Sequence, residues 1–432
     1  MAPSQSSPAA GAAAADVAWD ELRGIIGAEH VREAGASDAV AGVQPRMVAE
    51  PADEKQVAAV LRWANDAGVA LAPRGGGTKT GWGNPPARVD LVLATSRLNR
   101  IIEYAWADLT VVVEAGTAIH TLQQALAKHG QHVATDPLWP ERATVGGILS
   151  TNDSGALRLR FGALRDLVIG VTLALPDGTL AKSGGKVVKN VAGYDLPKLA
   201  TGALGTLGVI TQASFRLHPL ASEARTLTFR AASFVDANRL ILAAQDSPLA
   251  HTGLQARFAH DAPAAVDIRF EGTTAGIEAQ CGTVRKMATA GTEIGEFSDV
   301  WAAREALWSP GGDAVTLAKF SVLPSKISAA CEAIRRAAEQ GDMQWRIVVQ
   351  GTGLGWVCLE SPRPAAIHAG LVALRAEFER EAGSLFVAQH PARMTPFDAW
   401  GSAGDALPVM LRVKQQFDPR GILNPGRFVG GI

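Results

Sequence analysis

The stretch Pro73-Arg74-Gly75-Gly76-Gly77-Thr78-Lys79-Thr80-Gly81 follows an apolar run, 69–72, whose composition is typical of a buried strand. Three consecutive glycines remove three Cβ atoms, so the backbone N–H groups of this loop can lie against a charged ligand. A phosphate or pyrophosphate group is the ligand that this arrangement favours. The spacing matches neither the G-x-G-x-x-G fingerprint nor the P-loop. A flexible surface turn is the alternative interpretation, because glycine-rich turns are common.

Composition narrows the possible functions. The chain has 432 residues, of which 47% are hydrophobic and 19% charged, and its formal net charge is -1. This balance gives no electrostatic basis for binding nucleic acid, and we exclude that class. The longest apolar runs, such as 167–175, are far shorter than the ~20 residues that cross a bilayer, so we expect no membrane span. Residues 1–15 lack the features of a secretion signal, so we expect a disordered tail on a cytoplasmic protein, with any membrane association through a partner.

Cysteine and histidine positions argue against a metal centre. Cys281, Cys331 and Cys358 lie far apart without C-x-x-C spacing, which excludes a zinc ribbon, an iron–sulfur cluster and a disulfide framework. His129 and His132 have i, i+3 spacing, but a helix-breaking glycine stands between them, and we interpret both as loop residues. Any redox cofactor of this chain is therefore expected to be organic.

The first half of the chain shows an alternation of helices and strands. A helix is predicted over 53–67, with Asp53 as N-cap and Gly68 as the left-handed stop. A helical segment is expected over 16–42, and a second helix after Thr117, which is its expected N-cap. Strands are predicted at 69–72, 89–93, 109–114, 167–175, 180–182 and 209–217.

A second glycine-rich region extends from Asp136-Pro137 to Ser154-Gly155. Small residues alternate there with hydroxyl and amide side chains over about twenty positions, so that backbone can approach a ligand. Thr144, Asn152 and Ser154 offer side-chain hydrogen bonds to the same ligand. A loop that merely turns the chain does not need this length. Trp82 and Trp139 flank the two glycine regions. Either residue could stack near the ring of a bound ligand or simply pack against other side chains.

From about residue 221, short strands alternate with amphipathic helices, and the pattern occurs twice. The first copy has a strand at 226–229, a helix after Ser233, a hairpin over 254–270 and a helix through Cys281. The second has a strand at 315–322, a helix after Ser325, a hairpin over 345–359 and a helix over 367–378. Two such β-α-β-β-α units predict an antiparallel sheet with helices on one face.

Five segments in this order resemble the FAD-binding fold of the vanillyl-alcohol oxidase / PCMH superfamily, and within it the flavin-binding subunits of glycolate oxidases. They are 73–78, 144–155, 189–196, 204–211 and 422–426. The resemblance implies an α+β fold: a PCMH-type FAD-binding domain of two subdomains, followed by an antiparallel-sheet α+β cap domain of two ferredoxin-like units. It divides the chain into a tail (1–15), an N-terminal segment (16–44), the FAD-binding domain (45–220), the cap (221–400) and a C-terminal helix and tail (401–432).

The resemblance also implies the cofactor and its ligands. The glycine loop would hold the FAD pyrophosphate through its amides, because closely spaced backbone donors neutralise a dianion. Relatives with covalent flavin have a histidine where this chain has Thr78, so we expect non-covalent FAD. The implied cofactor-binding residues are Pro73, Arg74, Gly75, Gly76, Gly77, Thr78, Pro137, Thr144, Gly146, Gly147, Asn152, Ser154, Gly155, Ile210 and Asn424.

Related D-2-hydroxyacid dehydrogenases suggest the catalytic residues by resemblance. Arg304 and Lys319 would hold a substrate carboxylate, and His390 would remove the hydroxyl proton while the hydride goes to FAD. Each of these three residues also has a non-catalytic interpretation: Arg304 as a packing arginine, Lys319 as an ordinary strand lysine and His390 as an ordinary loop histidine. The chain departs from these relatives at two places: the hairpin that matches their metal-binding stretch, 349–357, has no His, Asp or Glu, and Gln389 replaces the carboxylate that precedes His390. We therefore expect no metal there.

Two hypotheses follow. In the first, the chain oxidises glycolate or a related 2-hydroxyacid such as D-lactate and passes electrons to a partner. In the second, it is an accessory subunit whose FAD is structural or relays electrons, while a homologous flavin subunit performs catalysis. The resemblance implies a hetero-oligomer with that catalytic flavin subunit and an iron–sulfur subunit. An oxidase that works alone with oxygen is a further possibility.

Overall fold

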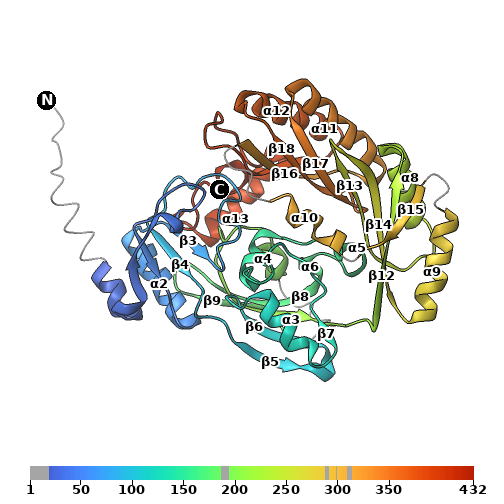
Figure 1. The fold of residues 1–432 in the computed structure, drawn as a ribbon. Helices are drawn as coiled ribbons and strands as arrows, with labels where there is room; N and C mark the ends of the chain where they lie inside the picture. The colour runs from blue at the N-terminus through green and yellow to red at the C-terminus, as the bar shows by residue number, and fades with distance from the viewer. Residues whose placement is uncertain (1–18, 186–193, 288–290, 298, 309–313) are drawn as a thin grey trace.

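The computed structural model describes residues 19–185, 194–287, 291–297, 299–308 and 314–432. Figure 1 shows two parts: a lower part built from two small sheets, and a cap with one large sheet covered by helices. The predicted tail and most of the segment 189–196 lie outside the described residues. None of the helices in the described part of the chain combines the length and apolarity that crossing a bilayer requires.

The first small sheet carries the glycine loop. Its strand order is β1-β2-β4-β3, in which β2, β4 and β3 are parallel and β1 is antiparallel. Asp53 caps α2 through a hydrogen bond from Gln56 N, and Gly68 ends the helix at φ 67°, as predicted. The bounds are β1 (Val31–Glu33), β2 (Met47–Ala49), α2 (Glu54–Ala67), β3 (Leu71–Arg74) and β4 (Leu91–Ala94).

The second small sheet is antiparallel, with strand order β5-β6-β10-β8-β9. Its buried face packs against α3 and α4 through residues such as Val113, Phe215, Leu122 and Ile148. The bounds are β5 (Ile101–Ala105), β6 (Thr110–Glu114), α3 (Ile119–Ala127), α4 (Val145–Thr151), α5 (Arg158–Phe161), α6 (Leu164–Leu167), β8 (Val168–Ala174), β9 (Leu180–Gly184), α7 (Leu196–Ala200) and β10 (Val209–Arg216); β7 (Gln131–His132) pairs with β11 (His218–Pro219) beside it.

The cap sheet has the order β15-β12-β14-β13-β17-β18-β16-β19, and each half repeats the ferredoxin-like order 4-1-3-2. The halves meet edge to edge where β13 pairs with β17. Each predicted repeat therefore gains a fourth strand, β15 or β19. The bounds are β12 (Glu223–Ala231), α8 (Phe234–Gln245), β13 (His251–Ala259), β14 (Ala262–Gly272), α9 (Thr274–Met287), β15 (Gly291–Glu296), α10 (Ala303–Ala306), β16 (Val315–Ser321), α11 (Ile327–Gly341), β17 (Gln344–Gln350), β18 (Leu354–Glu360), α12 (Pro364–Arg380) and β19 (Ser384–Gln389).

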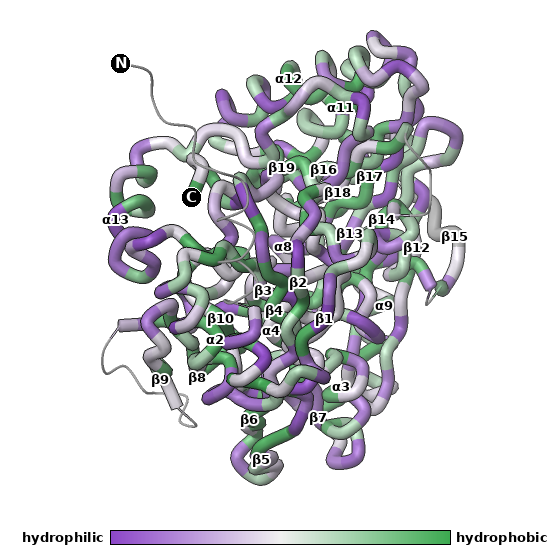
Figure 2. The backbone as a smooth tube through the Cα atoms, turned by 90° about the vertical axis from the view of Figure 1, so that its left-hand side faces the viewer, coloured by the Kyte–Doolittle hydropathy of each residue, from purple (hydrophilic) through white to green (hydrophobic). Residues whose placement is uncertain are grey.

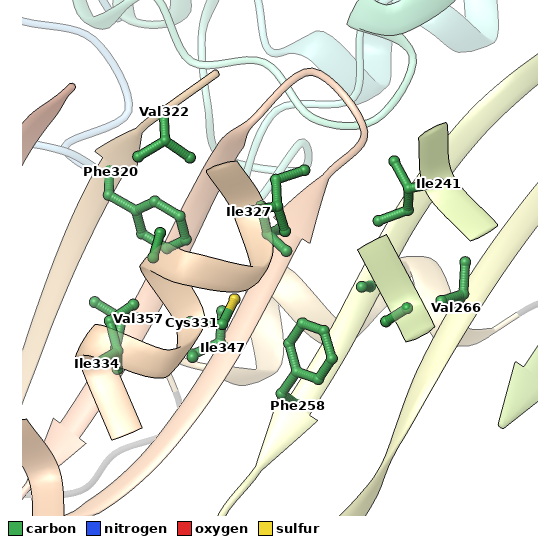
Figure 3. Packing of buried hydrophobic residues seen from close by; sticks show 14 of the residues in the cluster. Ile241, Phe258, Val266, Phe320, Val322, Ile327, Cys331, Ile334, Ile347 and Val357 are labelled. Carbon is green, nitrogen blue, oxygen red and sulfur yellow. The ribbon is translucent and has the colours of Figure 1, made fainter. Parts of the chain in front are cut away.

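Side chains alternate cleanly across this sheet, as the period of a strand requires. Phe258, Val266 and Ile347 point to the helices and pack with Ile241 and Ile327 (Figure 3). The intervening residues of the same strands face the lower part of the molecule and are largely polar, among them Gln255, Arg257, Asp267 and Arg269. These strands thus present an apolar face to the helices of the cap and a largely polar face to the rest of the chain. In the other half of the sheet, Leu317, Trp356 and Phe386 meet the rest of the chain with apolar side chains.

The end of the chain returns to the first sheet. Leu71 N donates to Ile422 O at 2.8 Å, and Asn424 N donates to Leu71 O at 2.9 Å, so the tail extends the sheet beside β3. Helix α13 (Leu407–Phe417) precedes this tail, stands at the edge of the molecule in Figure 2 and has no buried residue. The predicted terminal helix and turn-rich tail therefore match the structure.

Three local predictions are wrong. Residues 19–26 are helical, but the rest of the expected 16–42 helix contains a 3-10 turn and β1. The N-cap of α3 is Ala118, without a side-chain hydrogen bond, because Thr117 instead accepts Val145 N through its carbonyl at 3.0 Å. Helix α11 begins after a 3-10 turn over Pro324–Lys326, so Ser325 is not its cap.

Candidate functional site

A hollow of about 60 Å³ lies between the glycine loop and α4. The loop leaves β3 at the carboxyl end of the first sheet, and Thr144 caps α4 by accepting a hydrogen bond from Gly147 N at 3.3 Å. The loop and the helix therefore meet at the point where each exposes backbone N–H groups. The lining residues are Pro73, Arg74, Gly75, Gly76, Gly77, Thr78, Lys79, Thr80, Thr144, Gly147, Ser150, Thr151, Leu204 and Arg427.

The glycines of this loop are required by close packing. A Cβ atom at Gly75 would lie 2.0 Å from Thr144 Oγ1, and one at Gly76 would lie 1.7 Å from Arg142 O. Gly77 has φ 71°, a conformation that side chains disfavour. The flexible-turn alternative does not explain these contacts, because a free surface turn would have no such neighbours.

The second glycine region lies beside the first and leaves polar atoms without partners. Asn152 adopts a left-handed conformation at φ 47° and ends α4. Within the described residues, Asn152 Oδ1 and Ser154 Oγ are buried and have no hydrogen-bond partner. Gly155 N donates to Asp136 Oδ1 at 2.8 Å, which holds the two ends of the region together. Buried polar atoms of this kind normally find a partner, and a bound ligand would supply one.

Several predicted cofactor residues do not line the hollow at the glycine loop, among them Ile210, Asn424 and Gly146. Ile210 is in β10, where it pairs with Leu173 and packs in the core. Asn424 is buried and donates from Nδ2 to Leu204 O at 2.7 Å, so its side chain supports the loop that faces Pro73. Gly146 packs against Ala115. These residues shape the backbone around the hollow.

A residue that the sequence argument missed, Arg427, reaches the hollow from the C-terminal tail. It is 4% exposed, and its Nη2 donates to Thr80 O at 2.8 Å and to Trp82 O at 2.6 Å. Its Nε has no partner among the described residues, and burial lowers the pKa of Arg427 to about 10. A buried guanidinium beside a glycine loop is a suitable partner for an anion. The Asn-Pro-Gly-Arg run at 424–427 was the sequence feature that could have pointed to Arg427.

A larger cavity, about 370 Å³, lies between the lower part of the molecule and the cap. Pro137 and Gly155 from the second glycine region line one side, and Gln255, Gln350 and Trp301 line the cap side. Helix α10 closes it, and Figure 1 shows α10 between the cap strands and the helices below. The cavity thus adjoins the predicted cofactor residues.

Three buried charges meet next to this cavity. Asp153 is fully buried; its Oδ1 lies 3.0 Å from Arg304 Nη1, and its Oδ2 lies 3.1 Å from Lys79 Nζ. Arg304 also donates to Ser154 O at 2.8 Å and to Asp136 O at 2.6 Å. Burial alone would raise the pKa of Asp153, but the positive charges of Arg304 and Lys79 outweigh it and hold that pKa below its usual value. Asp153 is therefore ionised.

The other two predicted catalytic residues lie apart from the cavity. Lys319 is in β16, its Nζ lies 5.9 Å from the ring centre of Trp356, and burial lowers its pKa to about 8. His390 follows β19, and its Nδ1 lies 3.0 Å from Pro391 O. Among the described residues that line the cavity, Arg304 is present, whereas Lys319 and His390 are absent.

Aromatic residues fill the space between Lys319 and the glycine loop. Trp82 and Trp308 are stacked with ring centres 6.0 Å apart, and Trp82 and Trp356 are tilted at 5.3 Å. Lys79 Nζ lies 5.3 Å from the ring centre of Trp139 and 5.8 Å from that of Trp82. Trp82 and Trp139 therefore pack with the cap and flank the buried lysine.

Comparison with known proteins agrees with this geometry. Residues 45–184 match the family described as FAD binding domain. This part of the chain is an FAD-binding domain. Residues 399–428 match the family described as FAD linked oxidases, C-terminal domain, and this match contains Asn424 and Arg427. FAD is the cofactor of the domain, and the residues fit it: the glycine cradle has no room for Cβ atoms, and Asn152 and Ser154 offer free polar atoms.

Two curated relatives illustrate the range of the match to the FAD-binding domain. Glycolate oxidase subunit GlcD of Bacillus subtilis is 34% identical over 183 residues, which cover 42% of this chain and 39% of that protein. The match therefore spans about two fifths of that relative. D-2-hydroxyglutarate dehydrogenase of Stutzerimonas stutzeri is 26% identical over 425 residues, covering 89% of this chain and 90% of that protein.

A solved structure of alkyldihydroxyacetonephosphate synthase resembles the whole chain, cap included. It has a TM-score of 0.74 at 15% sequence identity and covers 99% of this chain and 86% of that chain. At this identity the likeness concerns the fold alone. The predicted α+β fold with a PCMH-type FAD-binding domain is confirmed.

Proposed function

We propose that this chain is an FAD-dependent oxidoreductase that acts on a small 2-hydroxyacid such as glycolate or D-lactate. The observation that carries the proposal is the 370 Å³ cavity, which has Pro137 and Gly155 of the FAD-binding domain on one side and the cap on the other. A volume of this size suits a small substrate beside a cofactor ring. The names of the relatives, glycolate oxidase subunit and D-2-hydroxyglutarate dehydrogenase, support the same substrate class.

In this reaction FAD would supply the hydride acceptor, and the chain would bind the substrate and move its proton. Arg304 lines the cavity and provides positive charge for a carboxylate. Lys319, whose pKa of about 8 leaves it protonated at neutral pH, adds charge nearby. We assign proton removal to His390 because a neutral imidazole nitrogen can accept the hydroxyl proton of the substrate. From the end of β19, His390 has to turn toward the cavity to do so.

A second candidate function is an accessory role in a glycolate-oxidising complex, in which the FAD of this chain is structural or relays electrons. Two observations favour it: Arg304 is already paired with Asp153, and among the described lining residues the β17–β18 hairpin contributes only Val348 and Gln350 of β17, neither of which is charged. Catalysis would then reside in a homologous flavin subunit. An iron–sulfur subunit would carry electrons onward, since the three cysteines here are free and buried at separate places.

Anaerobic stopped-flow spectroscopy on the isolated, FAD-loaded chain separates the two functions. We expect glycolate, D-lactate or D-2-hydroxyglutarate to bleach the flavin absorbance within one turnover. L-lactate is the matched control for the stereochemistry of the donor. Absence of bleaching with all three acids, followed by bleaching when a homologous flavin subunit is added, would establish the accessory role instead.

A further inference from the structure

Lys79 connects the glycine loop to the buried charges. It directly follows Thr78, and its Nζ donates to Thr78 Oγ1 at 3.3 Å and to Leu138 O at 3.2 Å. Lys79 lines the hollow at the glycine loop and also pairs with Asp153. A ligand bound at the glycine loop therefore lies against the residue that neutralises Asp153.

Asp153 connects the same charges to the cap. It stands between Asn152 and Ser154 of the second glycine region, and Leu138 N donates to its Oδ2 at 2.9 Å. Its other oxygen accepts from Arg304 of α10, the helix that closes the cavity. A single carboxylate thus stands between one cation of the cofactor loop and one cation of the cap.

The electrostatic interactions among Lys79, Asp153 and Arg304 depend on whether an anion is bound at the glycine loop. Two cations share one carboxylate, and they repel each other: the positive charge of Arg304 adds to burial in lowering the pKa of Lys79. An anion at the glycine loop would attract Lys79 and offset that repulsion. Asp153 would then interact mainly with Arg304, and the contact between α10 and the second glycine region would strengthen.

We propose that Asp153 is a positioning residue that couples occupancy of the glycine loop to the placement of α10 at the cavity. The proposal rests on FAD binding at the glycine loop. Cofactor binding orders the cavity wall through Lys79, Asp153 and Arg304, so that the cavity takes its final form in the FAD-loaded protein. Trp301 and Glu305 add further contacts of this segment, to Thr226 Oγ1 and Trp139 N respectively, and the negative charge of Glu305 also attracts Lys79.

Hydrogen exchange of residues 299–308 with and without FAD tests the coupling. We expect FAD to slow this exchange about fivefold in the wild-type chain, the lower end of typical coupling between sites. In Asp153→Asn the effect of FAD on residues 299–308 should disappear. Unchanged FAD-dependent protection in Asp153→Asn would overturn the proposal.

A second variant keeps the test independent of the folding of Asp153→Asn. In Lys79→Met, the negative charge of Asp153 is paired with the positive charge of Arg304 alone. We therefore expect slow hydrogen exchange of residues 299–308 even without FAD. Exchange as fast as in the wild-type apoprotein would contradict the proposal.

Asp38→Asn is the matched control for a loss of FAD affinity alone. Asp38 is buried and pairs at 2.7 Å with Arg74, which belongs to the glycine loop. The other hydrogen bonds of its carboxylate are made with Arg32 and Gly35 of the N-terminal segment, and not with the cap. The variant should therefore weaken FAD binding and retain the FAD-dependent protection of 299–308.

Fluorescence titration with FAD on each variant distinguishes failure of the coupling from failure of cofactor binding. A wild-type chain that binds FAD without any change at 299–308 would refute the coupling and leave the proposed function standing. A wild-type chain that binds no FAD would refute both.

Discussion

Arg304 of the cap and Asp153 of the FAD-binding domain form a buried ion pair, with Nη1 3.0 Å from Oδ1. The two residues are 151 positions apart in the sequence, so the pair joins the two parts of the chain. Arg304 is also held by two backbone carbonyls, and a substrate carboxylate in the cavity has to compete with Asp153 for it. The ion pair therefore contributes to the domain interface whichever function the chain performs.

Replacing Arg304 by Met should destabilise the chain strongly. The substitution leaves Asp153 buried with only Lys79 as its cation, and breaking a buried pair costs about 3–5 kcal/mol. Urea unfolding of the apoprotein measures the change. Arg336→Met is the control, because Arg336 pairs with Glu377 at the surface, where such a pair contributes about 1 kcal/mol or less. Equal effects of the two variants would contradict a structural role for the Arg304 pair.

Replacing Gly76 by Ala should weaken FAD binding strongly. The new Cβ atom would lie 1.7 Å from Arg142 O, a backbone atom with little freedom to move, so the loop has to shift. FAD titration by flavin fluorescence measures the loss, which we expect to exceed about tenfold in Kd. Gly81→Ala is the matched control in the same loop, since a Cβ atom there meets nothing within 4 Å. Tight FAD binding by Gly76→Ala would show that the cofactor lies elsewhere.

FAD should leave the protein when the chain is unfolded in acid. Thr78 occupies the position where relatives with covalent flavin have a histidine, and its Oγ1 accepts a hydrogen bond from Lys79 in this structure. A threonine hydroxyl offers no imidazole nitrogen for a flavin bond. Acid precipitation followed by absorbance of the supernatant at the flavin band provides the measurement. A yellow pellet would show a covalent link.

Local sequence signals predicted much of the fold, and long-range contacts explain where they failed. Asp53 and Gly68 bound α2 as predicted because both act within one turn of the helix. Thr117, whose carbonyl accepts a hydrogen bond from Val145 N of a distant segment, is not the cap of α3, and Ser325 lies inside the 3-10 turn that precedes α11. The fourth strands of the cap repeats, β15 and β19, pair with β12 and β16, from which two helices and two strands separate them in the sequence, and periodicity does not reveal such pairing.

The candidate site shows the same contrast between local sequence signals and long-range contacts. The glycine loop and Thr144 were found because their chemistry lies in adjacent residues, and the structure brings them to one hollow. Asp153 and Lys79 were missed because each looks ordinary in sequence and gains its role only from the other, 74 positions away, and from Arg304. The arrangement of buried charges is therefore a property of the tertiary structure, although each charge was visible in the sequence.

The stability of the chain should rise with pH between about 8 and the ordinary lysine pKa of 10.5 because of Lys319. Burial lowers its folded-state pKa, so over this range the unfolded chain binds more protons than the folded one, and raising the pH favours folding. Below about pH 8 both states are protonated and the burial penalty is constant. We expect Lys319→Met to be more stable than wild type at pH 7 and the difference to shrink by pH 10. A pH-independent difference would contradict a burial-lowered pKa.

Replacing Arg427 by Met should weaken FAD binding about 10- to 100-fold, the loss expected for a charge-assisted hydrogen bond of about 1.5–3 kcal/mol. Arg427 lines the hollow at the glycine loop, and its guanidinium donates to Asn424 Oδ1 and to the carbonyls of Thr80 and Trp82, all of them uncharged acceptors. Its positive charge is thus available to the pyrophosphate. Arg427→Lys keeps the charge and should retain part of the affinity.

Riboflavin, which has no pyrophosphate, separates this role from a structural one. If Arg427 binds the pyrophosphate, Arg427→Met lowers FAD affinity and leaves riboflavin affinity unchanged, because only the former ligand places phosphate at the glycine loop. If Arg427 only holds the backbone of Thr80 and Trp82, both affinities fall together and the apoprotein unfolds at a lower urea concentration. Parallel titrations of the two flavins with the wild-type chain and both variants decide between these outcomes.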